Sequence, residues 1–309
     1  MEHANGKARK ILLVADHPGW AFHHRAKEMM ALPSSKNLKV DLKYRDQITA
    51  KDNNQYDIIY AMSVLIANRL HHKGIPLNKL AAGITSSRQF NRYKGGKGTY
   101  KKEFLDFFTN LRGVNTVSNE FVQQFNKYRP IYKTRTGINE NLFKPSTDNT
   151  SQSTFTVGWV GRIDGHLHRE LKGYDIVLSA IKGLDMKLDI RTFTKNNVSR
   201  DKMVEFYQGL DCFICSSESE HIPLPVLEAG ACGVPIISTQ VGIVPEVIKP
   251  YENGIIIQRN ASAIREALLY LMKNPDQRKS MGRSIRHTIL DQWTWDVCWK
   301  EWEDFFTAI

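Results

Sequence analysis

The 309-residue sequence has little cysteine and no long apolar run. Four cysteines in a chain of this length do not make a disulfide framework, which favours a reducing compartment. No stretch approaches the ~18 to 20 uncharged apolar residues that a membrane span needs. The initial MEHANGKARK runs straight into a strand-like ILLVA, too short for the apolar region of a signal peptide. We therefore expect a cytoplasmic protein, with peripheral binding at the inner face of the membrane as the open alternative.

Acidic residues are scarce in the first half of the chain. Residues 1–150 hold 25 Lys and Arg against 12 Asp and Glu, a balance of +13. Residues 151–309 hold 18 against 20, a balance of −2, so all the excess positive charge lies in the first half. This asymmetry predicts a polyanionic partner for that half, either a nucleic acid or an anionic membrane surface. Ordinary charge for solubility is the alternative interpretation.

Motifs that hold metals or common cofactors are also missing. The sequence contains neither a Walker loop nor an EF-hand pattern. Cys212 and Cys215 are spaced like a redox or zinc pair, but they lie inside an apolar run with no second pair at ligand spacing. We expect both cysteines to be core residues, and we expect no metal site and no cofactor.

Apolar runs typical of buried parallel strands alternate with helical segments along the chain. The predicted strands are residues 10–16, 38–45, 56–63, 79–85 and 113–118, and then 155–161, 186–193, 210–216, 234–239 and 254–258. Such alternation predicts an α/β fold with parallel, doubly wound sheets and right-handed crossovers.

Two domains follow from a break in this pattern. Residues 144–154 are polar, rich in Ser and Thr, and carry a proline, so we take them as a linker. We place an N-terminal domain at 1–146 and a C-terminal domain at 147–309. The tail has aromatic residues at spacings of three and four, namely Trp295, Trp299, Trp302 and Phe306. This stripe predicts a final helix that packs back across the N-terminal domain.

Two carboxylates eight residues apart, Glu220 and Glu228, carry the clearest chemical signal. We expect Glu220 in the loop after the strand that ends near Ser216, and Glu228 at the opening of a helix. Ligands of doubly wound sheets bind where such loops and helix starts gather. Ionised carboxylates there are suited to accept hydrogen bonds from sugar hydroxyls. The alternative is that Glu228 only balances the helix dipole from the first turn.

The stretch 220–235 (EHIPLPVLEAGACGVP) resembles the E-x7-E signature of the GT4-type retaining glycosyltransferases with the GT-B fold. Further segments resemble the same family in the same order, namely VGWVGR (157–162), LKGYD (171–175), MVEFY (203–207), LDCFICS (210–216) and VGIVPE (241–246). In the first half, VSNEF (117–121) and TGINENLFKP (136–145) are similar to the family's strand-end serine and its run into the linker. The resemblance covers 113–305 well and 1–112 weakly.

The resemblance implies a GT-B fold, that is, two Rossmann-like domains facing a cleft. It also implies a UDP- or GDP-linked sugar as donor and metal-independent, hexosyl-type transfer with retention. Arg162 and Lys172 match the family's cations for the donor diphosphate, where positive charge stabilises the departing group. Glu220 matches the acid at the donor sugar and Glu228 the acid at the ribose. The donor-binding set further includes the backbone near Val226 and Leu227, and Gly19.

The sequence departs from the family pattern in four places. Residues 164–170 (DGHLHRE) lengthen the gap between the two cations, and His221 replaces the common glycine. A single-glycine loop, 16–20 (DHPGW), stands where a Gly-Gly loop is frequent. Thr85-Ser86-Ser87-Arg88 stands where many relatives carry a histidine, so no catalytic residue of the first domain is assigned. The histidines His17, His23 and His24 remain alternatives for that role.

Residues 88–102 hold six cations, three aromatics and no acid. We assign acceptor binding to the cations, which are Arg88, Arg92, Lys94, Lys97, Lys101 and Lys102. Basic residues among aromatics suit an anionic lipid surface, and they also suit nucleic-acid bases stacked on Phe90, Tyr93 or Tyr100. The main hypothesis is transfer to a lipid-linked or cell-surface glycan intermediate. The alternatives are a phage-type DNA glycosyltransferase and a catalytically silent sugar-nucleotide-binding protein. The oligomeric state stays open.

Overall fold

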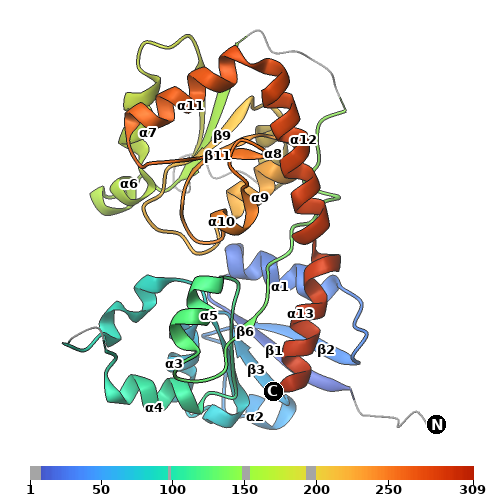
Figure 1. Cartoon of the computed structure of the whole chain (residues 1–309). Coiled ribbons are helices and arrows are strands. Elements are labelled where there is room, and N and C mark those ends of the chain that lie inside the picture. The colour runs from blue at the N-terminus through green and yellow to red at the C-terminus, as the bar shows by residue number, and fades with distance from the viewer. Residues whose placement is uncertain (1–7, 97–98, 148–153, 193–199) are drawn as a thin grey trace. The chain divides into compact units, whose positions relative to one another are not determined.

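The computed structural model describes residues 8–96, 99–147, 154–192 and 200–309. The chain forms two compact units, Met1–Gly137 with Trp295–Ile309, and Ile138–Thr294 (Figure 1). The division falls before the polar stretch at 144–154, because residues 138–147 already pack with the second unit. The last helix lies in unit 1, although the chain enters it from unit 2.

Unit 1 contains a six-stranded, fully parallel sheet in the order β2-β1-β3-β4-β5-β6. Its strands are β1 (Arg9–Ala15), β2 (Leu38–Tyr44), β3 (Ile58–Ala61), β4 (Leu80–Ile84), β5 (Gly113–Thr116) and β6 (Tyr132–Lys133). Its helices are α1 (Ala21–Ala31), α2 (Asp52–Gln55), α3 (Val64–His72), α4 (Lys102–Asn110), α5 (Asn119–Phe125) and α13 (Trp295–Ala308), with 3-10 turns at Leu77–Lys79 and Ser87–Tyr93. The first five strands were predicted, and the two-residue β6 was not.

Unit 2 contains a five-stranded parallel sheet in the order β11-β10-β9-β7-β8. Its strands are β7 (Thr156–Gly161), β8 (Lys187–Thr192), β9 (Cys212–Cys215), β10 (Ile236–Thr239) and β11 (Gly254–Ile257). Its helices are α6 (His166–Lys172), α7 (Tyr174–Ile181), α8 (Arg200–Gln208), α9 (Leu224–Ala231), α10 (Val244–Val247), α11 (Ala261–Lys273) and α12 (Pro275–Gln292). All five strands match the predicted ones.

The central strands form because their residues are mostly apolar and are covered on both faces. Ile11, Leu12, Leu13 and Val14 of β1 are completely buried, as expected of a central parallel strand. Cys212 and Cys215 of β9 are buried too, and their burial raises the pKa of both thiols. The prediction that this pair belongs to the core is confirmed.

Helix α13 closes the core of unit 1 with its aromatic face. Trp295, Trp299, Trp302 and Phe306 are buried in the same cluster as β1, β3 and β4. The Trp302 and Tyr60 rings meet edge to face at 5.5 Å between centroids. The stripe at spacings of three and four is therefore a packing face.

Parallel strands all point the same way, so the loops after them gather at one edge of each sheet. In unit 2 this edge carries the segments after β7, β9, β10 and β11, and it holds the candidate site. Among the described residues, no helix is both long and apolar enough to span a membrane.

Candidate active site

A cavity of about 190 Å³ opens at the carboxyl edge of the unit 2 sheet, beside β7 and β9. Its walls come from the ends of these strands, from Lys172 at the end of α6, and from the loop that leads into α9. The polar lining consists of Lys172, Ser216, Ser217 and Glu220. Two of the predicted site residues, Lys172 and Glu220, thus lie on one cavity.

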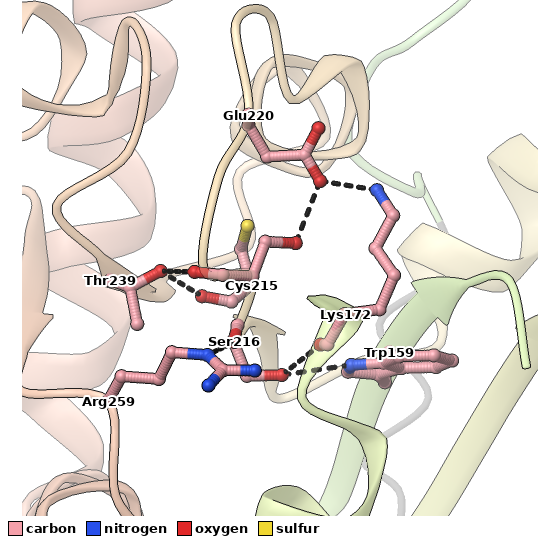
Figure 2. Close-up of polar contacts among 8 residues, drawn as sticks. Trp159, Lys172, Cys215, Ser216, Glu220, Thr239 and Arg259 are labelled. Carbon is pink, nitrogen blue, oxygen red and sulfur yellow. Dashed lines mark hydrogen bonds and ion pairs between the residues drawn. The ribbon is translucent and has the colours of Figure 1, made fainter. Parts of the chain in front are cut away.

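Lys172 and Glu220 form an ion pair across this cavity (Figure 2). The Ser217 hydroxyl donates a 2.7 Å hydrogen bond to the same carboxylate oxygen, Oε1 of Glu220. Both side chains of the pair are partly buried, so their charges are screened less than those of a surface pair. The cavity therefore presents a cation and a hydrogen-bond-accepting acid in direct contact.

Ser216 links the elements that carry this pair. Its hydroxyl accepts a 3.2 Å hydrogen bond from Trp159 Nε1 and donates one of 2.8 Å to the Lys172 carbonyl (Figure 2). Arg259, just after β11, donates from Nε to the Ser216 carbonyl at 3.1 Å and from its terminal nitrogen to the Glu170 carbonyl. Sequence reasoning missed Arg259, because a single arginine after a strand carries no pattern.

Two glycines, Gly173 and Gly242, let neighbouring segments pack closely against the loop after β9. Gly173 ends α6 with φ +70°, and a Cβ there would lie 2.4 Å from the Ser216 carbonyl oxygen. Gly242 has φ +51°, and its Cβ would lie 2.3 Å from the carbonyl oxygen of His221. The loop after β10 therefore packs directly on the loop that carries Glu220. His221, which departs from the family pattern, is itself buried.

Arg162 is not part of the cavity lining but lies at the end of β7, where it pairs with Asp164. Its Nε donates to Asp164 Oδ1 at 3.1 Å, and a terminal nitrogen donates to Oδ2 at 2.5 Å. These side-chain hydrogen bonds lower the pKa of Asp164 to about 2. The lengthened stretch 164–170 thus supplies the arginine with a counter-ion.

Glu228 lies in the second turn of α9, because the helix begins at Leu224 and has no acid in its first turn. The expectation that Glu228 opens the helix is therefore wrong, and so is the alternative of a first-turn dipole partner. Glu228 Oε2 accepts a 2.7 Å hydrogen bond from the hydroxyl of Tyr207, which is completely buried. Sequence reasoning did not pair these two side chains.

Val226 and Leu227 lie in α9, and both side chains are completely buried. The Val226 N–H already donates to the Pro223 carbonyl at 2.8 Å. Backbone N–H groups that an internal hydrogen bond occupies offer less to an outside anion than the free groups of a helix start. The Val226 N–H is thus already occupied by an internal hydrogen bond, so a diphosphate at this turn would need other hydrogen-bond donors as well.

Comparison with known proteins relates the chain to glycosyltransferases. Residues 184–288 match the family described as "Glycosyl transferases group 1". The chain is similar to sucrose-phosphate synthase from Thermosynechococcus elongatus (TM-score 0.72, 14% identity, 97% of this chain and 100% of that one). It is equally similar to Anabaena HepE solved with UDP and glucose (TM-score 0.72, 13% identity, 97% and 100%). The chain has the GT-B fold.

Sequence relatives of this GT-B chain carry glycosyltransferase names. Capsular polysaccharide biosynthesis glycosyltransferase CapM of Staphylococcus aureus is 26% identical over 194 residues, covering 55% of this chain and 49% of CapM. An uncharacterized glycosyltransferase of Methanocaldococcus jannaschii is 27% identical over 148 residues, covering 41% and 42%. The chain thus spans less than half the length of these relatives. These relatives and the family match support a relationship between this chain and glycosyltransferases of the GT-B fold.

The first unit of the GT-B chain has its own residues at the carboxyl edge of its sheet. Gly19 follows β1 with φ +76°, and no atom lies within 4 Å of where its Cβ would be. His17 Nε2 lies 2.8 Å from a terminal nitrogen of Arg45. His23 Nδ1 lies 2.6 Å from the Tyr44 hydroxyl. These contacts join the loop after β1 and the first turn of α1 to the end of β2.

In the basic stretch 88–102 the described cations are exposed, Phe90 is buried, and Tyr93 and Tyr100 are half-buried. Arg92, Lys94, Lys101 and Lys102 are exposed, while Lys97 and the side chain of Arg88 lie outside the described residues. Phe90 is 1% exposed and lies 4.6 Å from Phe125 between ring centroids. Tyr93 stacks on Phe104 at 4.6 Å. The expectation that Phe90 could stack on bases is wrong, because its ring belongs to the core.

Within the described ranges, no group of three or more His, Cys, Asp or Glu side chains is arranged to hold a metal ion.

Proposed function

We propose that this protein is a GT4-type glycosyltransferase that moves a hexosyl sugar from a UDP- or GDP-linked donor, with retention and without a metal ion. The contact between Lys172 and Glu220 carries the proposal. In a nucleotide sugar the anionic diphosphate is bonded directly to the sugar. A protein that binds both parts therefore needs a cation beside a group that accepts hydrogen bonds from the sugar hydroxyls. The cavity in unit 2 offers this pair.

Each residue has a role in this proposal. Lys172 and Arg162 stabilise the negative charge that grows on the departing diphosphate. Glu220 accepts hydrogen bonds from the hydroxyls of the donor sugar, and Glu228 accepts them from the ribose. We keep Gly19, in the loop after β1, as a further donor-binding residue of the proposal. Anabaena HepE, which has been solved with UDP-glucose, supports the nucleotide-sugar class of donor.

The acceptor is an anionic molecule held by the basic first half, and we favour a lipid-linked glycan at a membrane surface over DNA. The burial of Phe90 supports this choice, because single-stranded nucleic acid binding relies on exposed aromatic side chains. The exposed Arg92, Lys94, Lys101 and Lys102 suit a layer of anionic head groups instead.

A thermal-shift panel of UDP- and GDP-sugars tests the donor, because bound ligand raises Tm in proportion to RT ln(1 + [L]/Kd). Donor hydrolysis without acceptor then separates an enzyme from a silent binding protein. We expect one nucleotide series to stabilise the protein and the same donor to be hydrolysed slowly in the presence of EDTA. Loss of hydrolysis with EDTA, restored by Mg²⁺ or Mn²⁺, would contradict metal independence. A protein that binds no nucleotide sugar would contradict the proposal itself.

A further inference from the structure

Tyr207 is completely buried, and its hydroxyl contacts Glu228, a candidate binding residue. It lies on α8, and its OH donates a 2.7 Å hydrogen bond to Oε2 of Glu228 on α9. The two residues are 21 positions apart, so the contact joins two helices. A phenol needs a hydrogen-bond partner when it is buried, and here the partner is an acid expected to bind ligand.

Three other rings hold the Tyr207 ring in place. Its centroid lies 5.1 Å from Phe206, 5.9 Å from Phe213 and 6.1 Å from Phe143. Phe206 lies on α8 itself, whereas Phe213 on β9 and Phe143 in the segment that enters unit 2 approach Tyr207 from other elements. Packed interiors leave such a ring few alternative rotamers. The position of the hydroxyl is therefore set by the core of unit 2.

The electrostatics keep the hydroxyl a donor. Burial, followed by the nearby Glu228 charge and the hydrogen bond to it, raises the pKa of Tyr207 well above its ordinary value. The phenol therefore stays protonated throughout the neutral range. A hydrogen bond from a neutral donor to an ionised carboxylate is stronger than one between two neutral groups.

We propose that Tyr207 is a positioning residue that orients the Glu228 carboxylate for the ribose of the donor nucleotide. This inference rests on the proposed function, in which Glu228 binds the ribose. A free glutamate side chain would lose rotamer entropy each time it bound a ligand. A carboxylate already held by a rigid phenol has been ordered before binding, so its hydrogen bonds to the ribose hydroxyls contribute more affinity.

The test compares UDP with 2′,3′-dideoxy-UDP by calorimetry, or the matching GDP pair if wild type prefers GDP. We expect wild type to bind the ribonucleotide at least about tenfold more tightly than the dideoxy form. In Tyr207→Phe and in Glu228→Gln this ratio should fall towards one, and the double variant should add little to Glu228→Gln. Tyr60→Phe is the matched control, because Tyr60 is also buried and donates to Asn115 at 2.9 Å in the other unit.

A merely structural Tyr207 would weaken both ligands equally and leave the ratio at its wild-type value, which would overturn the inference. If Tyr207→Phe does not fold, Phe143→Leu keeps the hydroxyl and loosens the ring, and it should lower the ratio part of the way. An unchanged ratio there would also overturn the inference. A wild-type protein that does not discriminate between the two ligands would instead show that Glu228 does not bind ribose, which refutes the proposed role of Glu228 and the inference with it.

Discussion

At the scale of single residues, the proposed role of Arg162 in binding the donor diphosphate can be tested separately from its ion pair with Asp164. The Arg162 guanidinium forms an ion pair with Asp164, so a variant that lacks the arginine loses this ion pair as well as the proposed contact with the donor. We expect Arg162→Ala to cost transfer about 2 to 4 kcal/mol, because the proposed function assigns this cation to the departing diphosphate. Steady-state kinetics with the preferred donor measures this change.

The matched control for Arg162 is Asp164→Asn, which keeps the arginine and removes its counter-ion. We expect near wild-type transfer from Asp164→Asn, since the pair is on the surface and such pairs contribute little to stability. Equal losses in both variants would mean that the ion pair matters and that Arg162 does not act on the donor.

At the scale of secondary-structure elements, one buried carboxylate joins α13 to the loop before β2. Glu303 accepts hydrogen bonds from the Ser34 hydroxyl at 2.9 Å, from the Ser35 N–H and hydroxyl at 2.5 and 2.7 Å, and from the Lys36 N–H at 3.2 Å. Burial raises the pKa of Glu303, but these hydrogen bonds together lower it more, so it lies below the ordinary value.

The lowered pKa of Glu303 predicts how the stability of unit 1 changes with pH. A depressed folded-state pKa gives stability that is present above the unfolded pKa of 4.5 and is lost as pH falls through the folded value. We expect Glu303→Gln to lower the free energy of unfolding by about 2 kcal/mol at pH 7 and by less at pH 3. Denaturant unfolding at both pH values, followed by tryptophan fluorescence, measures the difference.

Asp304→Asn serves as the control on the same helix. Asp304 is exposed and lies 3.7 Å from Lys36, so its removal should change stability by no more than about 0.5 kcal/mol. If Glu303→Gln destabilised the protein equally at both pH values, the anchoring role of the ionised carboxylate would be wrong.

At the scale of the whole molecule, the +13 balance of residues 1–150 predicts binding that weakens with salt. Neutralising Lys94, Lys97, Lys101 and Lys102 to glutamine should weaken binding to anionic vesicles by up to about 1000-fold, since each basic side chain near the surface contributes about 1 kcal/mol. The variant should also bind with a flatter salt dependence and unchanged donor affinity. Vesicle cosedimentation at several salt concentrations measures this.

The control removes the same charge from the other half of the chain. Lys182, Lys187, Lys249 and Lys273 are exposed and lie in residues 151–309. Changing these four to glutamine should leave vesicle binding as in wild type. Retention of DNA in place of vesicles, at moderate salt, would favour the nucleic-acid acceptor. A chain that binds neither at low salt would show that its basic half serves solubility.

Local patterns were enough to predict most of the fold and part of the site. Of the eleven strands in the described residues, ten were predicted from local patterns, and the two-residue β6, too short to show a period, was missed. The position of Glu220 in the loop after β9 was also predicted, because a loop must follow a buried strand. These features depend on residues near one another in the chain, and hydrophobic periodicity records that kind of information.

The partners of the candidate residues came from the tertiary structure alone. Periodicity does not specify that β9 lies between β7 and β10, and this order brings Lys172, Ser217 and Glu220 to one cavity. The same holds for Arg259 on the Ser216 carbonyl and for Tyr207 on Glu228. Both contacts join residues from separate elements, and their geometry follows from how those elements pack. No spacing along the chain encodes that packing, because interior side chains interlock only between elements that lie together in three dimensions.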